Sequence, residues 1–124
     1  MSISAEKLTD EIMRELEQYS DEVATGMKVS IDDVSKTCLS EIRKASPKRT
    51  GAYKKGWVRK KIYESQGGIK YVIYNKSHYQ LTHLLERGHA KRSGGRVGGK
   101  PHISPAETRA KKALIIKLKE VIGQ

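Results

Sequence analysis

The chain has 124 residues, enough for one domain with a modest hydrophobic core and too few for two. Its composition is 36% hydrophobic and 31% charged with no Phe, and no apolar run approaches the roughly 18 residues of a membrane span, so no membrane contact is expected. The single cysteine, Cys38, excludes an internal disulfide and indicates a reducing cytoplasm, and the acidic amphipathic N-terminus is unlike a signal peptide.

The net charge of +11 is unevenly distributed along the chain. Residues 1–46 carry six Lys or Arg and ten Asp or Glu, whereas residues 47–124 carry 19 and four. A basic half of this strength implies a polyanionic partner, either nucleic acid or the acidic face of another protein. A well-solvated basic surface without a specific partner is the plainer alternative.

A single apolar stripe runs through the acidic N-terminal part of the chain. Its residues recur at steps of three or four, which places them on one face of an α-helix. They are Leu8, Ile12, Leu16, Tyr19, Val23, Met27, Ile31, Val34, Cys38 and Ile42. The pattern predicts a long acidic helix over residues 1–46. Pro47 ends it, because the residue before a proline avoids the α-helical conformation.

Two features near the middle of this stripe leave a second arrangement open. Gly26 costs about 1 kcal/mol relative to Ala inside a helix. Ser30 followed by Asp33 matches the start of a capping box, so a second helix could begin there. Because the stripe keeps its phase across this stretch, we expect one long helix, bent at most.

Residues 47–103 are predicted to form a basic β-hairpin region. Trp57–Tyr63 and Ile69–Tyr74 are rich in β-branched and aromatic residues, as strands are. The glycines of Gln66-Gly67-Gly68 between them suit a hairpin turn. Leucines at helical spacing predict a short helix within Tyr79–Arg87.

The region closes with a loop, and a C-terminal helix follows. Residues 88–100 contain five glycines and four Lys or Arg, which predicts a flexible loop. A helix is predicted over residues 104–122, with Ser104 as the N-cap, Pro105 as the first helical residue and Glu107 completing a capping box. Its apolar stripe consists of Ala106, Ala110, Leu114, Leu118 and Val121.

The glycine-rich loop contains a partial match to a phosphate-binding loop. Gly94, Gly99 and Lys100 stand at the spacing of the first seven positions of that motif. The eighth residue is Pro101, where magnesium coordination requires Ser or Thr, and no suitable strand precedes the match. We attribute the match to chance and expect no bound nucleotide or other cofactor.

The chain also lacks a pattern that would bind a metal or perform catalysis. Its four histidines, at spacings of 5, 6 and 13 residues, fit no zinc motif, and surface or loop positions are expected for them. These histidines are His78, His83, His89 and His102. Cys38 lies on the apolar stripe, where a small core residue is commoner than a nucleophile. The chain is therefore not expected to be an enzyme.

Aromatic and basic residues alternate in the first predicted strand. Trp57, Arg59, Lys61 and Tyr63 are expected on one face. Such a face could stack on single-stranded nucleic acid. We favour the alternative that Trp57 and Tyr63 belong to the core, because a chain without Phe needs its large aromatic residues for packing.

Three short motifs follow one another in an order that resembles the tail-component family of tailed bacteriophages. They are a Pro–x–x–Thr–Gly turn after the long helix, a Glu–x–Gly signature, and a Pro–x–x–x–Pro–Ala opening of the last helix. Their residues in this sequence are Pro47, Thr50 and Gly51; Glu86 and Gly88; and Pro101, Pro105 and Ala106. The resemblance covers nearly the whole chain, with one departure, His89, where many relatives carry Thr.

The resemblance implies an α+β fold in which the N-terminal and C-terminal helices pack on a small antiparallel β-sheet. It also implies a tail-completion subunit in a hexameric ring, between the head-side connector and the tail-terminator or tail-tube protein. Such a subunit is made in the host cytoplasm, ends in the virion, and has no catalytic residues. The motif residues are then structural.

The basic loop suits a segment that faces a partner protein or makes weak contact with DNA in the channel of such a ring. The loop residues concerned are Lys91, Arg92, Arg96 and Lys100. The main alternative is a small basic nucleic-acid-binding protein, and a small nuclease or toxin is a more distant one. A free-standing DNA-binding protein has no evident use for the acidic first helix.

Overall fold

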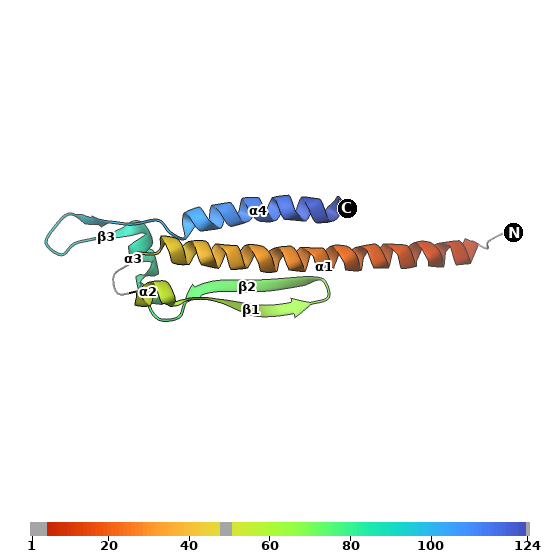
Figure 1. The fold of residues 1–124 in the computed structure, drawn as a ribbon, viewed down its shortest axis with the longest axis horizontal. Helices are drawn as coiled ribbons and strands as arrows, with labels where there is room; N and C mark the ends of the chain where they lie inside the picture. Colours follow the sequence, from red (N-terminus) through yellow and green to blue (C-terminus); the bar gives the residue numbers. More distant parts are fainter. Residues whose placement is uncertain (1–4, 48–50, 124) are drawn as a thin grey trace.

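A long helix forms the axis of the molecule, and the other elements lie along its sides or gather at one end (Figure 1). The computed structural model describes residues 5–47 and 51–123, with side chains from residue 10 onward. The long helix, α1, spans Ala5–Ala45, and the last helix, α4, spans Ser104–Ile122 and runs antiparallel to it. Between them in sequence come two small antiparallel sheets of two strands each. The α+β class predicted from the sequence is therefore confirmed.

Helix α1 is continuous across Gly26, as its apolar stripe predicts. Its 41 residues correspond to about 60 Å at the rise of an α-helix. The hydroxyl of Ser30 donates to the carbonyl oxygen of Gly26 at 2.9 Å, so Ser30 does not begin a second helix. A Cβ atom on Gly26 would lie 2.8 Å from Cγ1 of Val121, which shows that the end of α4 approaches α1 there.

The C-terminal end of α1 lies where the sequence predicts it. The backbone N–H of Ser46 donates to the carbonyl oxygen of Ile42 at 2.9 Å, and the Ser46 hydroxyl donates to the same oxygen at 2.6 Å. Ser46 is buried, and Pro47 follows it. The last turn of α1 therefore has its Ile42 carbonyl oxygen bonded twice by Ser46, which is itself buried.

A hairpin of β1 (Trp57–Ser65) and β2 (Gly68–Asn75) lies along another side of α1 (Figure 1). Both strands and the turn between them are as predicted, and each strand is two residues longer. The register pairs Trp57 with Asn75 and shifts between Lys61 and Tyr63, where β1 contains a bulge.

The bulge corrects the expectation that Trp57 and Tyr63 share one face. Lys61 pairs with Tyr71, whereas Tyr63 pairs with Lys70, the neighbouring residue on the opposite face of β2. Trp57 is 3% exposed and belongs to the core, but Tyr63 is 54% exposed. A bulge cannot be read from alternation, because the alternation itself is what it interrupts.

Short helical segments precede and follow the β1–β2 hairpin in the chain. Helix α2 spans Ala52–Lys55 and precedes β1, and Gly51 at its start has a φ of +81°. After β2, a 3-10 turn, η1 (Tyr79–Leu81), leads into α3 (Thr82–Arg87). The short helix predicted in this stretch is confirmed.

Residues 88–100, predicted as a flexible loop, contain regular structure. This segment forms a second hairpin, β3 (Gly88–Ala90) paired with β4 (Arg96–Gly98). Gly88 is buried with a φ of +83°, and a Cβ there would overlap the carbonyl oxygen of Val97. The glycines read as a sign of flexibility instead allow two strands to approach closely and to turn.

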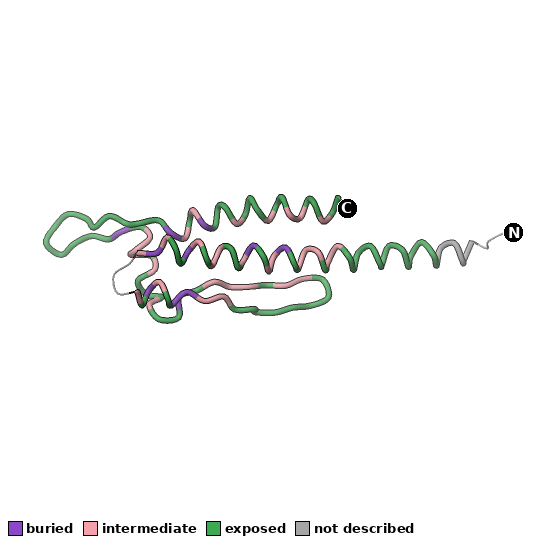
Figure 2. The backbone as a smooth tube through the Cα atoms, viewed as in Figure 1, coloured by how far each residue is buried: buried purple, intermediate pink, exposed green. Residues whose placement is uncertain are grey.

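The core lies at the end of the molecule where all the elements meet. It consists of Ile42, Tyr53, Trp57 and Ala106, which come from α1, α2, β1 and α4. Cys38 packs against this cluster, as expected for a small core residue, and burial raises the pKa of its thiol. Figure 2 shows that buried positions concentrate at this end, whereas the described N-terminal part of α1 is exposed. No helix in the described ranges is long and apolar enough to cross a membrane.

Candidate functional site

The second and third motifs come together at the start of α4, where Glu86 contacts the residues that follow Pro101. Glu86 lies in the last turn of α3, Gly88 opens β3, Pro101 precedes α4, and Pro105 lies in the first turn of α4. Ala106 is fully buried in the core. Thr50 lies outside the described residues.

The carboxylate of Glu86 caps helix α4. It accepts backbone N–H groups from His102 at 2.7 Å, Ile103 at 2.9 Å and Ser104 at 2.9 Å. Burial alone would raise the pKa of Glu86, but these donors and the nearby His102 outweigh it, so the pKa lies below its ordinary value. A negative charge is also favourable at the positive end of a helix dipole.

This arrangement corrects the predicted capping box. The N-cap position belongs to Ile103 and has no side-chain cap, and Ser104 is already the first helical residue. Glu107 forms an exposed ion pair with Lys111 at 3.1 Å. A carboxylate 18 residues upstream of Ser104 satisfies the N–H groups that a local capping box would otherwise satisfy.

His102 is fully buried, which is contrary to the surface or loop position expected for it. Its Nε2 lies 2.6 Å from the hydroxyl of Tyr53, and its Nδ1 lies 2.8 Å from the carbonyl oxygen of Lys100. A carbonyl oxygen only accepts, so Nδ1 donates to Lys100, while Nε2 and the Tyr53 hydroxyl share a hydrogen bond. The ring thereby links α2 to the segment that enters α4.

Asn75 is a second buried polar residue that sequence reasoning missed. Its side-chain amide donates to the carbonyl oxygen of Tyr53 at 2.7 Å. Its side-chain oxygen accepts the N–H groups of Ser77 at 3.1 Å and His78 at 2.8 Å. The hydrogen bonds of Asn75, like those of Glu86 and His102, are made to this chain's own backbone and core.

Glu86, His102 and Asn75, which we call the buried polar cluster, therefore support the fold through their contacts. In the described part of the chain, no group of three or more His, Cys, Asp or Glu side chains could hold a metal ion. His83 and His89 are exposed, as expected, and stand apart from His102 in the chain. Glu86 and His102 therefore hold the start of α4 against α3 and α2.

Arg59 and its partners fasten the hairpin to α1. The Arg59 guanidinium donates to Asp32 at 2.6 Å and to the Ser35 hydroxyl at 2.8 Å, and it lies 4.3 Å from the ring centre of Tyr71. The hydrogen bond from Arg59, followed by that from Lys36, holds the pKa of Asp32 well below its usual range. This cation and aromatic ring thus face α1 within the protein, and Trp57 is buried beside them.

The four cations assigned to the basic loop lie on or beside the β3–β4 hairpin and are all exposed. Lys91 and Arg92 stand in its turn, and the Arg96 guanidinium donates to the carbonyl oxygen of Arg87 at 3.1 Å. Lys100 stands at the base, where its backbone N–H donates to Leu85 at 2.8 Å. Figure 1 shows the hairpin projecting from the core end of the molecule.

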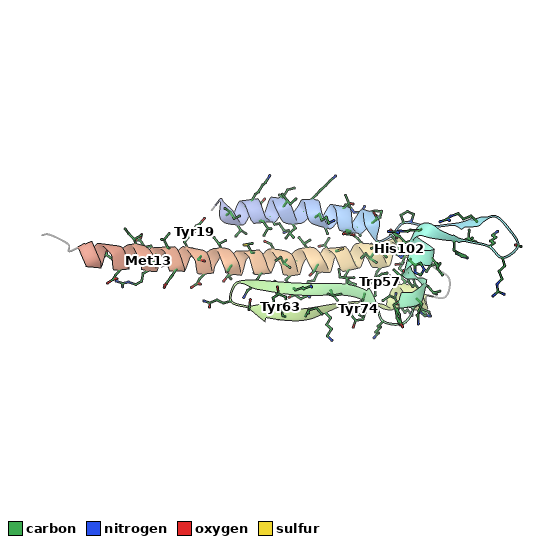
Figure 3. The ribbon with its side chains drawn as sticks, turned by 180° about the vertical axis from the view of Figure 1, so that it is seen from behind. Met13, Tyr19, Trp57, Tyr63, Tyr74 and His102 are labelled. Carbon is green, nitrogen blue, oxygen red and sulfur yellow. The ribbon has the colours of Figure 1, made fainter. Side chains whose placement is uncertain are left out.

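Exposed apolar side chains gather on three surfaces. One is the N-terminal part of α1, where Met13 and Tyr19 are labelled in Figure 3. A second is the outer side of α4, and a third is the β1–β2 hairpin, where Tyr63 is 54% and Tyr74 39% exposed. Large exposed apolar surfaces of this kind mark sites of contact with other proteins.

Comparison with known families gives one match. The family of HK97-gp10-like bacteriophage tail components matches residues 10–88, which are 79 of the 124 residues. The matched stretch contains α1 from residue 10 onward, the β1–β2 hairpin and α3, together with Glu86 and Gly88. No curated protein and no solved structure matches the chain.

The family match and the observed fold agree with one another. The match covers more than half of the chain, and the motif residues that the structure describes lie in the expected order within an α+β fold. The exposed apolar surfaces suit a protein that works among other virion proteins. The chain therefore belongs to the HK97-gp10-like family and is a structural component of a bacteriophage tail, incorporated into the virion.

Proposed function

We propose that this tail component is a tail-completion subunit, which joins the DNA-filled head to the tail without performing catalysis. It would act as part of a hexameric ring between the head-side connector and the tail-terminator or tail-tube protein. Assembly would take place in the host cytoplasm, and the ring would remain at the head–tail junction of the virion.

The observation that carries this proposal is the uncovered N-terminal part of α1. Ile12, Leu16 and Tyr19 are each about half exposed on a rigid helix that extends beyond α4. Burying a side chain the size of Leu or Ile fully is worth about 1.5–3 kcal/mol relative to leaving it in water. A subunit that leaves several such residues in water gains stability when a neighbour covers them.

The division of charge supports contacts between unlike surfaces. Residues 1–46 have a formal charge of −4, and residues 47–124 have a formal charge of +15. Rings are built from interfaces in which one surface of a subunit meets a different surface of the next. Unlike charges on two such surfaces favour this head-to-tail contact and disfavour contacts between like surfaces.

The exposed cations of the β3–β4 hairpin are proposed to face a partner protein or DNA passing through the ring. Contacts with DNA would be weak and independent of sequence, because the genome must leave through the same channel. Exposed Lys and Arg bind phosphates without reading bases, which suits such contacts. The residues concerned are Lys91, Arg92, Arg96 and Lys100.

The proposal is tested by removing the gene from its phage and imaging the particles by electron microscopy. The expected result is full heads and complete tails that are not joined, with joining restored when the protein is supplied. A variant with Ala at the four hairpin cations should fold and fail in the same step. Particles that remain joined and infectious without the protein would refute a role in joining.

A small basic nucleic-acid-binding protein is the second candidate, and the exposed cations of the β3–β4 hairpin favour it. Two observations weigh against it: Trp57 is buried, and Arg59 is engaged with Asp32. Trp57 and Arg59, two of the four residues of β1 that suggested a stacking surface, are thus occupied within the protein. Tight, sequence-selective binding to a duplex at physiological salt would favour this candidate.

A further inference from the structure

The surface that α4 occupies on α1 continues beyond the end of α4 and is empty there. The hydroxyl of Tyr19 donates to the carbonyl oxygen of Ile122 at 3.1 Å, at the last turn of α4. Further toward the N-terminus, Ile12 is 48% exposed and Leu16 is 57% exposed. These residues continue, at helical spacing, the stripe on which the α4 contact at Gly26 lies.

Acidic side chains flank this empty stripe. Residues 10–22 contain six acidic side chains and one basic one. Glu11, Glu15 and Glu22 stand at spacings of four and seven residues, so they form a row along one side of the stripe. All three are exposed. We call Ile12, Leu16, Tyr19 and this row of glutamates the α1 stripe.

The outer side of α4 has the complementary pattern. Ile115 and Ile122 stand seven residues apart and are 54% and 56% exposed. Lys111, Lys112 and Lys119 stand at helical spacing around them and are exposed. We call these five residues the α4 face. Its residues are exposed, whereas α4 contacts α1 and the core through another side, which contains Val121 and Ala106.

We propose that the α1 stripe of one copy of this chain docks on the α4 face of a second copy. The apolar residues would pack against each other, with the glutamate row beside the lysines. Two α1 stripes brought together would place glutamates against glutamates, and two α4 faces would place lysines against lysines. Charge therefore selects the unlike pair, and rim charges act mainly on orientation and specificity.

The lengths of the two surfaces fit this contact. Helix α4 has 19 residues and is about 28 Å long, whereas Ile12 to Tyr19 covers about 10 Å of the α1 axis. The stripe therefore fits within the length of α4. Each copy presents one surface of each kind, so the contact is head-to-tail and can be repeated around a ring.

The contact should be weak between two isolated copies. Stable protein interfaces involve about 20–30 residues on each side, and this one uses far fewer. We therefore expect a monomer at micromolar concentration, with association strengthened when several contacts close together on the tail. The inference rests on the proposed ring and names the surfaces from which the ring is built.

A disulfide-trapping experiment on the purified full chain tests the contact even if it is weak. All proteins carry Cys38→Ser, and one carries Leu16→Cys while the other carries Ile115→Cys. Both new cysteines replace exposed side chains, and circular dichroism checks the fold. When the two are mixed and oxidised, the heterodisulfide should exceed the half share that random pairing gives, and the excess should shrink at high salt.

A matched control replaces Asp21, which lies on the other side of α1, with cysteine. Asp21→Cys with Ile115→Cys should give only the random share. A predominant Leu16→Cys homodimer would overturn the proposal in favour of pairing between α1 stripes. Equal yields for the Leu16→Cys and Asp21→Cys mixtures would overturn it in favour of a different protein as the occupant.

Charge reversal provides a second measurement. Glu15→Lys in the Leu16→Cys protein should reduce the excess of heterodisulfide, and Lys112→Glu in its partner should restore it. Loss without restoration would contradict the pairing of these two surfaces. Because only purified protein is used, a negative result leaves the role in head–tail joining to the imaging of particles that lack the protein.

Discussion

Glu86 joins two segments that are distant in the sequence, because it accepts three backbone N–H groups at the start of α4. The Glu86→Gln variant keeps one acceptor oxygen and presents an amide group to N–H donors. Hydrogen bonds to charged groups contribute about 1.5–3 kcal/mol, so we expect a loss of this order in the free energy of unfolding at neutral pH. Chemical denaturation measures it.

The same variant should change how stability depends on pH. The folded-state pKa of Glu86 is lowered, so its ionised form stabilises the fold above the ordinary Glu pKa of about 4.3. This contribution disappears as the pH falls through the lowered value, so wild type should lose more stability on acidification than Glu86→Gln. The exposed Glu107 provides the control, and equal effects of Glu86→Gln and Glu107→Gln would contradict the capping role.

Substitutions at Gly51 test whether the turn before α2 requires a left-handed backbone conformation. Its φ is +81°, and a Cβ there would meet no atom within 4 Å among the residues that the structure describes, so the main effect expected of a side chain is on the backbone. The left-handed conformation costs an ordinary residue about 1–2 kcal/mol. Gly51→Val should therefore lower the thermal midpoint, and Gly51→Asn should lower it less. Equal midpoints for Gly51→Val and wild type would show that the turn is not constrained.

At the scale of elements, the approach of α4 to α1 depends on Gly26. Gly26→Ala should gain about 1 kcal/mol in helix propensity, but its Cβ would lie 2.8 Å from Val121. The substitution should therefore be more favourable in a Val121→Ala background than in wild type, with a coupling of about 0.5–3 kcal/mol. A double-mutant cycle of unfolding free energies measures this. Strict additivity would mean that the helices do not touch here in solution.

The β3–β4 hairpin should be the first site of proteolysis. It has three-residue strands and exposed side chains, and it packs little apolar surface, so local opening needs little free energy. Trypsin is expected to cut first after Lys91, Arg92 or Arg96, as identified by mass spectrometry. Early cleavage at Arg59 instead would contradict the protection given by its ion pair with Asp32.

The elements predicted correctly are those whose signals are local in sequence. The apolar stripe of α1 has ten members between Leu8 and Ile42, and Pro47 marks the end of the helix, so both could be read without any tertiary information. The strands β1 and β2 were likewise predictable from their β-branched and aromatic residues and from the glycines of the turn between them. The family motifs add the order of these elements.

The buried polar cluster could not be predicted, because its contacts connect residues far apart in the sequence. Nothing near Glu86 indicates that it will cap a helix beginning at Ser104, and a local capping box was the natural competitor. In the sequence, His102 and Asn75 are ordinary polar residues. Only the fold brings Tyr53 beside them. The position of His102 between Pro101 and Pro105, inside a tail-component motif, is the sequence signal that could have suggested an architectural role for it.

At the scale of the whole molecule, the basic surface should bind DNA only weakly. With four phosphate contacts, affinity should fall with roughly the 3.6th power of salt concentration, at a slope of about −0.9 per contact. Fluorescence anisotropy with two unrelated duplexes should show no sequence preference and negligible binding near physiological salt. Nanomolar affinity under those conditions would favour the nucleic-acid-binding alternative. Ala at the four hairpin cations should flatten the salt dependence.

The β3–β4 hairpin is closed at its base, and this affects how much its length and sequence can differ between related tail components. The N–H of Lys100 bonds to Leu85, and Glu86 holds the following residues, so the chain leaves and re-enters the fold at one point. Doubling the length of a flexible loop costs only about 0.6 kcal/mol when its ends are already held together. The hairpin can therefore lengthen, shorten or change its charges while the helices stay in place, which lets one scaffold be adapted to different neighbours.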